Sequence, residues 1–203
     1  MALTFNGSTN TITGLAVGGL PDGIVDTDMI AAAAVTAPKR GAGSQLQVVS
    51  TAKTDVWTDS SQSWVDVTGF SLNITPASTS NKILILLDAK VSQGTVNKEL
   101  FLKIVRTISS TAADVYVGDA ASNRTRCTYG FEDADHSTAP YEMKQVHATF
   151  LDSPNTTSQI NYKIQMRVGN NGGNAYLNRT GNDGDSANFP RCASSITALE
   201  VAG

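Results

Sequence analysis

The chain has 203 residues, of which 40% are hydrophobic and 16% are charged, against a typical charged share of about 25%. The formal net charge is -3 and the charges are scattered, without the basic stripe of a nucleic-acid-binding protein. No apolar run reaches the roughly 18 residues of a membrane-spanning helix. We therefore expect neither nucleic acid nor membrane insertion.

The first ten residues lack the basic and apolar regions of a secretory signal, so we expect synthesis in a cytoplasm. The stretch Gly14–Gly41 is apolar, but it is too short and too rich in glycine to form a core of its own. Asp26 or Thr27 can cap a short helix over residues 27–37, which Pro38 ends.

The apolar side chains of this stretch need a partner surface. We predict that identical chains cover one another around an axis, as in a closed homo-oligomer. Docking onto the chain's own β-domain is the alternative. The predicted axis or shaft residues are Leu15, Val17, Leu20, Ile24, Met29, Ile30, Ala33 and Ala34.

The composition changes at Gly41-Ala42-Gly43-Ser44, a short flexible connector. Upstream, alternation of apolar and polar residues is almost absent, and downstream it begins at once. We predict an N-terminal attachment or shaft segment over 1–44 and a C-terminal β-domain over 45–203.

The β-domain consists of short segments with the period of two that is typical of strands. In Lys82–Leu87 every residue after the lysine is Ile or Leu, so the segment is apolar on both faces. This pattern predicts a central strand that is covered on both faces. The fold class is therefore all-β, a β-sandwich of jelly-roll type. The predicted strands are 46–50, 64–67, 70–74, 82–87, 100–105, 113–117, 145–150, 160–168 and 196–201.

Two long loops, Gly118–Glu142 and Gly169–Ala193, interrupt this pattern. Long loops in compact domains are often functional, and we expect these two to lie near each other at one end. Asparagine amides and a tyrosine ring suit the hydroxyls and apolar faces of a sugar, and arginines suit an anionic one. The predicted receptor-binding residues are Asn170, Asn171, Asn174, Tyr176, Asn178, Arg179, Arg124 and Arg126. The alternative is a glycine-rich loop whose asparagines serve its own turns.

The best acidic cluster contains Glu132, Asp133 and Asp135, which could supply the carboxylate pair of a glycoside hydrolase. Adjacent acids on a loop are more typical of a solvated surface, and His136 and His147 suggest no triad. We expect no enzyme activity.

No metal or cofactor is expected. The segment 182–186 alternates oxygen ligands like a calcium loop but lacks the later bidentate glutamate. Cys127 and Cys192 are expected to be free thiols, because no export signal precedes them; their spacing leaves a disulfide possible.

Several segments resemble phage tail fibres, especially those of marine and cyanobacterial phages. In the N-terminal part these are Ile12-Thr13-Gly14-Leu15, Gly19-Leu20-Pro21-Asp22-Gly23-Ile24 and the run Ile30–Thr36, and at the end Ser195–Glu200. The β-region, with Trp64–Val67, Phe70–Ile74 and Lys82–Leu87, is similar to trimeric jelly-roll tips of the C1q/TNF shape.

This resemblance implies a short homotrimeric fibre of the virion. Its N-terminus would join other tail or baseplate proteins, and its C-terminal knob would bind a cell-surface glycan or protein of the host without catalysis. A polysaccharide depolymerase and a purely structural connector or decoration protein are the alternatives.

Overall fold

The computed structural model describes residues 4–9, 11–13, 40–132 and 141–203. It divides into two compact units, Met1–Arg40 and Gly41–Gly203. In the first unit, β1 (Thr4–Asn6) pairs antiparallel with β2 (Thr11–Thr13). The predicted helix over 27–37 and the predicted axis residues from Leu15 to Ala34 lie outside the described residues.

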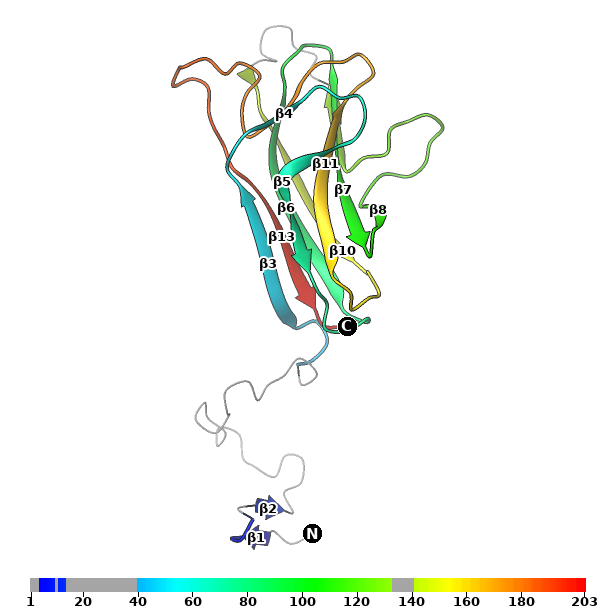
Figure 1. Cartoon of the computed structure of the whole chain (residues 1–203), viewed down its shortest axis with the longest axis vertical. Coiled ribbons are helices and arrows are strands. Elements are labelled where there is room, and N and C mark those ends of the chain that lie inside the picture. Colours follow the sequence, from blue (N-terminus) through cyan, green and yellow to red (C-terminus); the bar gives the residue numbers. More distant parts are fainter. Residues whose placement is uncertain (1–3, 10, 14–39, 133–140) are drawn as a thin grey trace. The chain divides into compact units, whose positions relative to one another are not determined.

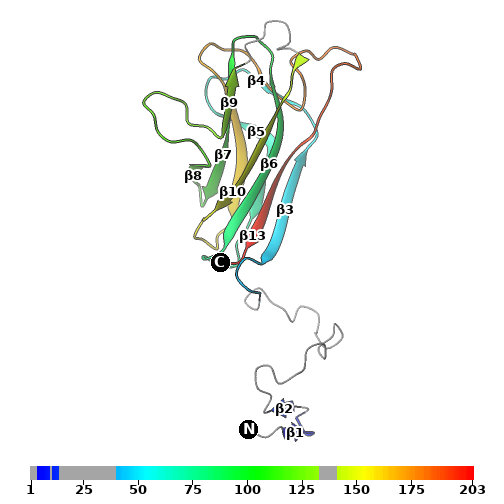
Figure 2. The same cartoon turned by 180° about the vertical axis from the view of Figure 1, so that it is seen from behind.

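The second unit contains two antiparallel sheets (Figures 1 and 2). In sheet I, β13 and β10 pair with opposite edges of β6, because both pair with the same residues of β6. The short strand β12 continues the line of β13 along β6, and β4 pairs with it. The strands of sheet I are β3 (Gln45–Lys53), β13 (Ser194–Val201), β6 (Lys82–Gln93), β10 (Lys144–Asp152), β12 (Ala175–Leu177) and β4 (Trp57–Asp59).

Sheet II has the order β5, β11, β7, β8. Strands β8 and β9 follow one another along the same edge of β7, because β8 pairs with its second half and β9 with its first. The strands of sheet II are β5 (Val65–Ile74), β11 (Ile160–Val168), β7 (Glu99–Ile108), β8 (Thr111–Val115) and β9 (Tyr129–Glu132).

The order of these strands is that of a jelly roll. If the short strands β4 and β12 are left out and β8 and β9 count as one position, the described strands of the second unit fill eight positions in chain order. Sheet I then contains the first, eighth, third and sixth, and sheet II the second, seventh, fourth and fifth. Two Greek keys folded onto each other give this arrangement, so the expected all-β, jelly-roll-like sandwich is confirmed.

The core lies between the sheets and follows the period of two in the sequence. Strand β11 shows this most clearly. Every second side chain from Ile160 to Val168 is fully buried, five in all, and the four side chains between them are half-buried. Strand β7 of the same sheet adds Leu102 and Ile104 to this layer, and β6 of sheet I supplies facing side chains that include Ile85. The predicted strand 160–168 is confirmed to the residue.

The two strands predicted at 64–67 and 70–74 form one strand, β5. Gly69 allows this because its φ of 76° lies in the left-handed region. Here the pairing with β11 slips, from Ser71 opposite Lys163 to Asp66 opposite Gln165. A bulge of this kind keeps apolar side chains on the core face on both sides of the irregularity.

The prediction that Lys82–Leu87 is covered on both faces was wrong. Ile83, Ile85 and Leu87 are buried between the sheets, but Leu86 is 39% exposed on the outer face, where Leu84 is half-buried. The strand also continues to Gln93, beyond the predicted end.

A buried polar network joins the two sheets near the start of β11. Arg106 on β7 donates through Nη1 to both carboxylate oxygens of Asp152 on β10, at 2.7 and 2.8 Å. The hydroxyl of Tyr162 on β11 donates to Asp152 at 2.6 Å. Burial, and then the hydrogen bond to Asp152, raises the pKa of Tyr162 far above its usual value. The phenol therefore stays neutral in the folded protein.

Candidate functional site

The predicted receptor-binding residues of the 169–179 segment differ in how exposed they are. Asn170 and Asn171 are exposed on the turn after β11, whereas Asn174 and Tyr176 are half-buried. The backbone oxygen of Asn171 accepts from Lys98 Nζ at 2.8 Å, and its amide donates to Glu99 at 3.4 Å. The two exposed asparagines remain candidates for contact with a ligand.

Asn178 cannot meet a ligand in this structure, which corrects its predicted role. Its side chain is 0% exposed. Its amide nitrogen donates to the backbone oxygens of Lys53 at 2.7 Å and Asp55 at 3.0 Å, and its oxygen accepts from Ser194 at 2.6 Å. Asn178 is thus a structural link between three segments.

Arg179 and Tyr176 interact with each other. The guanidinium lies 4.4 Å from the centre of the tyrosine ring. It also donates to the backbone oxygens of Thr180 and Gly181, both at 2.9 Å, and pairs with Asp183 at 3.1 Å. These contacts occupy Arg179 and cover one side of the ring, so this pair offers less to a ligand than the sequence suggested.

Arg124 and Arg126 lie on a surface loop between β8 and β9. Its ends meet where the Gly118 nitrogen donates to the Cys127 oxygen at 3.3 Å, and Arg126 Nε donates to the Gly118 oxygen at 2.7 Å. Both arginines are exposed. In Figures 1 and 2 the loop projects to the side of β8. Compact loops with closed ends frequently carry function, and we call residues 118–127 the arginine loop.

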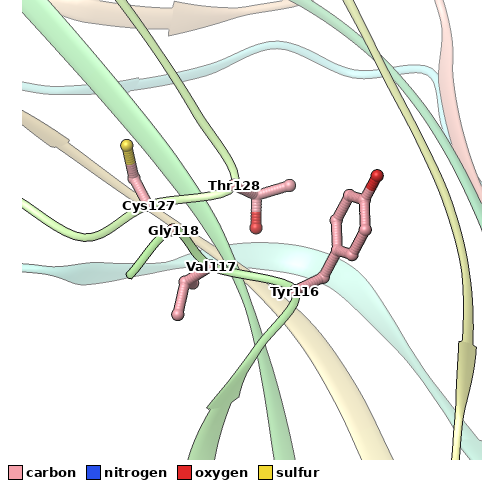
Figure 3. A pocket seen from close by; sticks show the side chains of 5 residues that line it. All are labelled: Tyr116, Val117, Gly118, Cys127 and Thr128. Carbon is pink, nitrogen blue, oxygen red and sulfur yellow. The ribbon is translucent and has the colours of Figure 1, made fainter. Parts of the chain in front are cut away.

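A hollow of about 380 Å³ opens at the base of the arginine loop, lined by Tyr116, Val117, Gly118, Cys127 and Thr128 (Figure 3). In Figure 3 the side chain of Thr128 lies between those of Cys127 and Tyr116. Tyr116 is 52% exposed, and its ring stacks on that of Phe150, with centres 4.7 Å apart and planes 8° from parallel. One face of an aromatic ring is therefore held rigidly while the other remains accessible.

Tyr116 has a backbone φ of 54°, a conformation that costs a bulky residue about 1–3 kcal/mol. The stack on Phe150 holds the residue there. Strained residues concentrate at functional sites, so this outlier marks the hollow as a candidate site. Nothing in the sequence indicated this site, because Tyr116 lies near the end of a predicted strand and its neighbours carry no signal of a positive φ.

The two long loops contact each other in part. Tyr141 at the end of the first stacks on Phe189 in the second, with ring centres 5.8 Å apart. The arginine loop, in contrast, lies apart from the 181–192 segment in both views (Figures 1 and 2). Each predicted loop also contains an unpredicted strand: β9 in the first and β12 in the second.

The candidate catalytic side chains that the structure describes lie in ordinary structural surroundings. His147 is 62% exposed on β10, with Nδ1 3.7 Å from Asp88. Both cysteines are free thiols, and burial raises the pKa of Cys127, which weakens it as a nucleophile. Glu132 lies on β9; Asp133, Asp135 and His136 lie outside the described residues.

The 182–186 segment is held by arginines. Asp183 pairs with Arg191 at 2.6 Å as well as with Arg179, and the Asn182 oxygen accepts from the backbone nitrogen of Gly184 at 3.2 Å. No cluster of three or more His, Cys, Asp or Glu side chains arranged for a metal occurs in the described ranges. The same ranges contain no helix long and apolar enough to cross a membrane.

No protein-family model and no curated protein matches the chain. Among solved structures, it is similar to chains of infectious bursal disease virus at 14% identity. The Gt strain structure gives a TM-score of 0.38 and covers 79% of this chain and 39% of that one. For the Gx strain the values are 0.36, 77% and 37%, and for the VP2 subviral particle 0.34, 77% and 38%. The chain thus spans about two fifths of the length of these structures.

Proposed function

We propose that the protein is a virion attachment protein of the short tail-fibre type, a homotrimer whose jelly-roll domain binds a host cell-surface receptor without catalysis. The N-terminal segment would join other tail or baseplate proteins. The observation that carries the proposal is the hollow beside the strained, exposed Tyr116, with the arginine loop at its rim.

The chemistry of this site favours a saccharide. The accessible face of Tyr116 suits the apolar face of a sugar ring, and the hydroxyl of Thr128, whose oxygen accepts from the Ile104 backbone nitrogen at 3.3 Å, can donate to a sugar hydroxyl. Arg124 and Arg126 add donors that match carboxylate or sulfate groups. An anionic glycan is therefore the receptor class that the site supports best, and a protein with acidic side chains is the second.

Weak single sites suffice for such a protein. Three copies of one site on a trimer act together on a repetitive cell surface, and avidity raises the overall affinity by about 10² to 10⁴. A shallow, open hollow that would hold a small ligand poorly can thus serve in attachment.

Binding to immobilised neutral and anionic oligosaccharides tests the proposal. We expect Tyr116→Ala to weaken binding to every sugar that binds, and Arg124→Ala with Arg126→Ala to weaken binding to anionic sugars by at least tenfold, since a charged hydrogen bond contributes about 1.5–3 kcal/mol. Arg191→Ala is the matched control, because Arg191 is exposed on the other loop. Equal loss in the control and the site variants, or no loss in any, would contradict the proposed site.

One observation favours the depolymerase alternative. Glu99 and Glu132 lie directly opposite each other on β7 and β9, so their Cβ atoms are about 5 Å apart on one face of the sheet. Retaining glycosidases hold two carboxyl groups about 5–5.5 Å apart, a separation that side chains at such opposed positions can reach. Release of reducing ends from a bound polysaccharide, abolished by Glu132→Gln, would establish catalysis and overturn the non-catalytic proposal.

A further inference from the structure

The outer face of sheet II carries a row of aromatic and cationic side chains. Arg167 on β11 is half-buried between two fully buried neighbours, so it points away from the core. Phe101 on β7 lies directly opposite Arg167, and such residues share one face of a sheet. Trp64 precedes β5 on the other side. The Arg167 guanidinium lies 5.3 Å from the ring centre of Phe101 and 5.9 Å from that of Trp64, so two aromatic rings hold it in place.

Arg167 has donors to spare. Lys163, four residues earlier on the same strand and face, pairs with Asp66 at 2.7 Å. Arg167 forms no such ion pair within the described residues. Its Nη2 donates to Asn170 Oδ1 at 3.4 Å, and its Nε is buried without a hydrogen-bond partner. A planar guanidinium in this state suits a ligand that presents acceptor oxygens.

Glu99 supplies acceptors beside this guanidinium. It lies on β7 two residues before Phe101, and therefore on the same face. Its side chain reaches over Gly169 on the neighbouring chain segment, where a Cβ would overlap Glu99 Oε2. Glu99 Oε1 accepts from Asn171 Nδ2 at 3.4 Å, whereas Oε2 is buried and has no partner in the part of the chain that the structure describes.

A hydroxyl group satisfies both unpaired atoms, because it donates to a carboxylate and accepts from a guanidinium. Buried polar atoms without partners are uncommon in folded proteins, and the two here are a donor and an acceptor on one face. The hydrogen bonds that hold Arg167 and Glu99 to the turn after β11 are both long, at 3.4 Å. Turning these side chains toward a ligand therefore loses little hydrogen-bond energy.

The charges of the described residues around this face balance. Arg167 is positive, and so is Lys98, whose Nζ donates to the Asn171 oxygen at 2.8 Å. Glu99 and Glu132, which lie opposite each other on β7 and β9, are negative. An anionic group would meet the two glutamates and a cationic group the two basic side chains. This balance favours a neutral ligand with many hydroxyls.

We infer that this face binds a neutral sugar residue of the receptor glycan, an inference that rests on the proposed function. The rings of Trp64 and Phe101 offer apolar surface to a sugar ring, Arg167 and Glu99 bind its hydroxyls, and the exposed asparagines after β11 add amide groups. We call this set the Arg167 site; it consists of Trp64, Glu99, Phe101, Arg167, Asn170 and Asn171.

Cys127 connects the Arg167 site to the hollow at Tyr116. It lines the hollow, and its Sγ lies 3.3 Å from the position that a Cβ on Gly130 would take. Gly130 lies opposite Phe101, which lies opposite Arg167, so two strand spacings, about 10 Å, separate Gly130 from Arg167. One sugar ring does not span this distance. The ligand that fills both sites is an oligosaccharide with an anionic residue near the arginine loop and a neutral residue at Arg167.

The fluorescence of Trp64 tests the inference in the full chain. The chain has two tryptophans, so Trp57→Phe leaves Trp64 as the only one. The probes are oligomers of glucose, galactose, mannose and N-acetylglucosamine, each with and without a terminal uronic acid. We expect at least one neutral oligomer to change the Trp64 emission. Arg167→Ala should weaken that binding by about tenfold or more, as loss of a charged hydrogen bond does. Lys163→Ala, on the same strand and face, is the matched control.

Two further variants sharpen the test. Glu99→Gln keeps the shape of the side chain and removes its charge. Neutral oligomers should therefore bind several-fold more weakly, while oligomers with a uronic acid lose less. Arg167→Lys keeps the charge without the planar fork and should also weaken binding, and it replaces Arg167→Ala if circular dichroism shows that the alanine variant does not fold.

Each outcome decides the inference. Unchanged Trp64 emission with every probe, or equal losses in the Arg167 and Lys163 variants, overturns the Arg167 site. A Glu99→Gln variant with an unchanged preference overturns the assignment of a neutral residue. Binding to immobilised glycans tests the proposed function separately. Binding that Tyr116→Ala abolishes and Arg167→Ala leaves unchanged refutes this inference alone, whereas no binding to any immobilised glycan refutes the proposed function.

Discussion

The network of Arg106, Asp152 and Tyr162 allows a quantitative test of how the two sheets are held together. Asp152→Ala removes the carboxylate that accepts from both partners, which lie on different strands of sheet II. In the folded protein the side chain of Arg106 is 21% exposed and that of Asp152 is 11% exposed. The substitution therefore leaves one half-buried cation and one fully buried tyrosine without their acceptor.

The expected cost follows from these contacts. An unpaired buried hydroxyl costs about 1–3 kcal/mol, and breaking one side of a buried ion pair costs about 3–5 kcal/mol. Because Arg106 retains some contact with water, we expect Asp152→Ala to lose about 3 kcal/mol of unfolding free energy, a large share of the total of about 5–15 kcal/mol for a domain. Tyr162→Phe removes one hydrogen bond and leaves Arg106 paired, and is expected to cost about 1 kcal/mol.

Urea unfolding of the wild type, the two single variants and the double variant at one protein concentration measures these values. Fixed concentration matters because association stabilises the folded state. The residues are in contact, so the double variant is expected to cost less than the sum of the singles. Equal losses for Asp152→Ala and Tyr162→Phe, or additive losses in the double variant, would refute the view that Asp152 is the shared acceptor.

Three further predictions concern stability. The raised pKa of Tyr162 means that the folded protein keeps the phenol proton at a pH near 10, where the unfolded tyrosine loses it. The contribution of this proton to stability is complete below pH 10 and decreases above pH 10 by up to about 1.4 kcal/mol per pH unit. Tyr162→Phe should therefore flatten the alkaline decrease of the unfolding free energy in urea by that amount, and an unchanged slope would contradict the prediction. Asn178→Ala should cost about 3 kcal/mol of unfolding free energy, about one for each of its three hydrogen bonds. Asn170 is exposed, so Asn170→Ala should change the unfolding free energy by less than about 0.5 kcal/mol in the same thermal unfolding measurement. Equal effects would mean that burial of Asn178 has no energetic role. Gly69→Ala should cost about 1–2 kcal/mol of unfolding free energy because the backbone φ at Gly69 is 76°. A steric clash is not the cause, since the nearest atom to a new Cβ would be Lys53 Nζ at 3.7 Å. Thr68→Ala is the comparison, and equal costs for the two substitutions would exclude a backbone origin.

Much of the fold was predictable because a half-buried strand shows its burial in the sequence. The alternation from Ile160 to Val168 determined one strand exactly as the structure has it, since every second side chain enters the core. Lys82–Leu87 has no such signal, because Leu84 and Leu86 are as apolar as their buried neighbours. Composition alone does not distinguish a face covered within the chain from one that a second chain could cover.

The candidate site was less predictable, because its residues owe their positions to contacts distant in sequence. Asparagine is equally suited to a ligand and to a buried backbone link, and Asn178 serves the latter through partners more than 100 residues away. Tyr116 is accessible because Phe150 on another strand supports its ring. The arginine loop was identified from its residue types alone, since exposed arginines in a long loop need no distant partner.

The proposed trimer and the proposed site predict different losses for one substitution in two binding assays. Each copy of the chain carries one hollow, with Tyr116 in its lining and the arginine loop beside β8. Three copies of this site on one trimer give avidity only where they engage a surface together, so a loss at each site is compounded over the sites that bind. Tyr116→Ala should therefore reduce attachment to a sugar-coated surface by a larger factor than it reduces binding of a single soluble sugar. Equal losses in the two assays would show that the sites of a trimer do not act together.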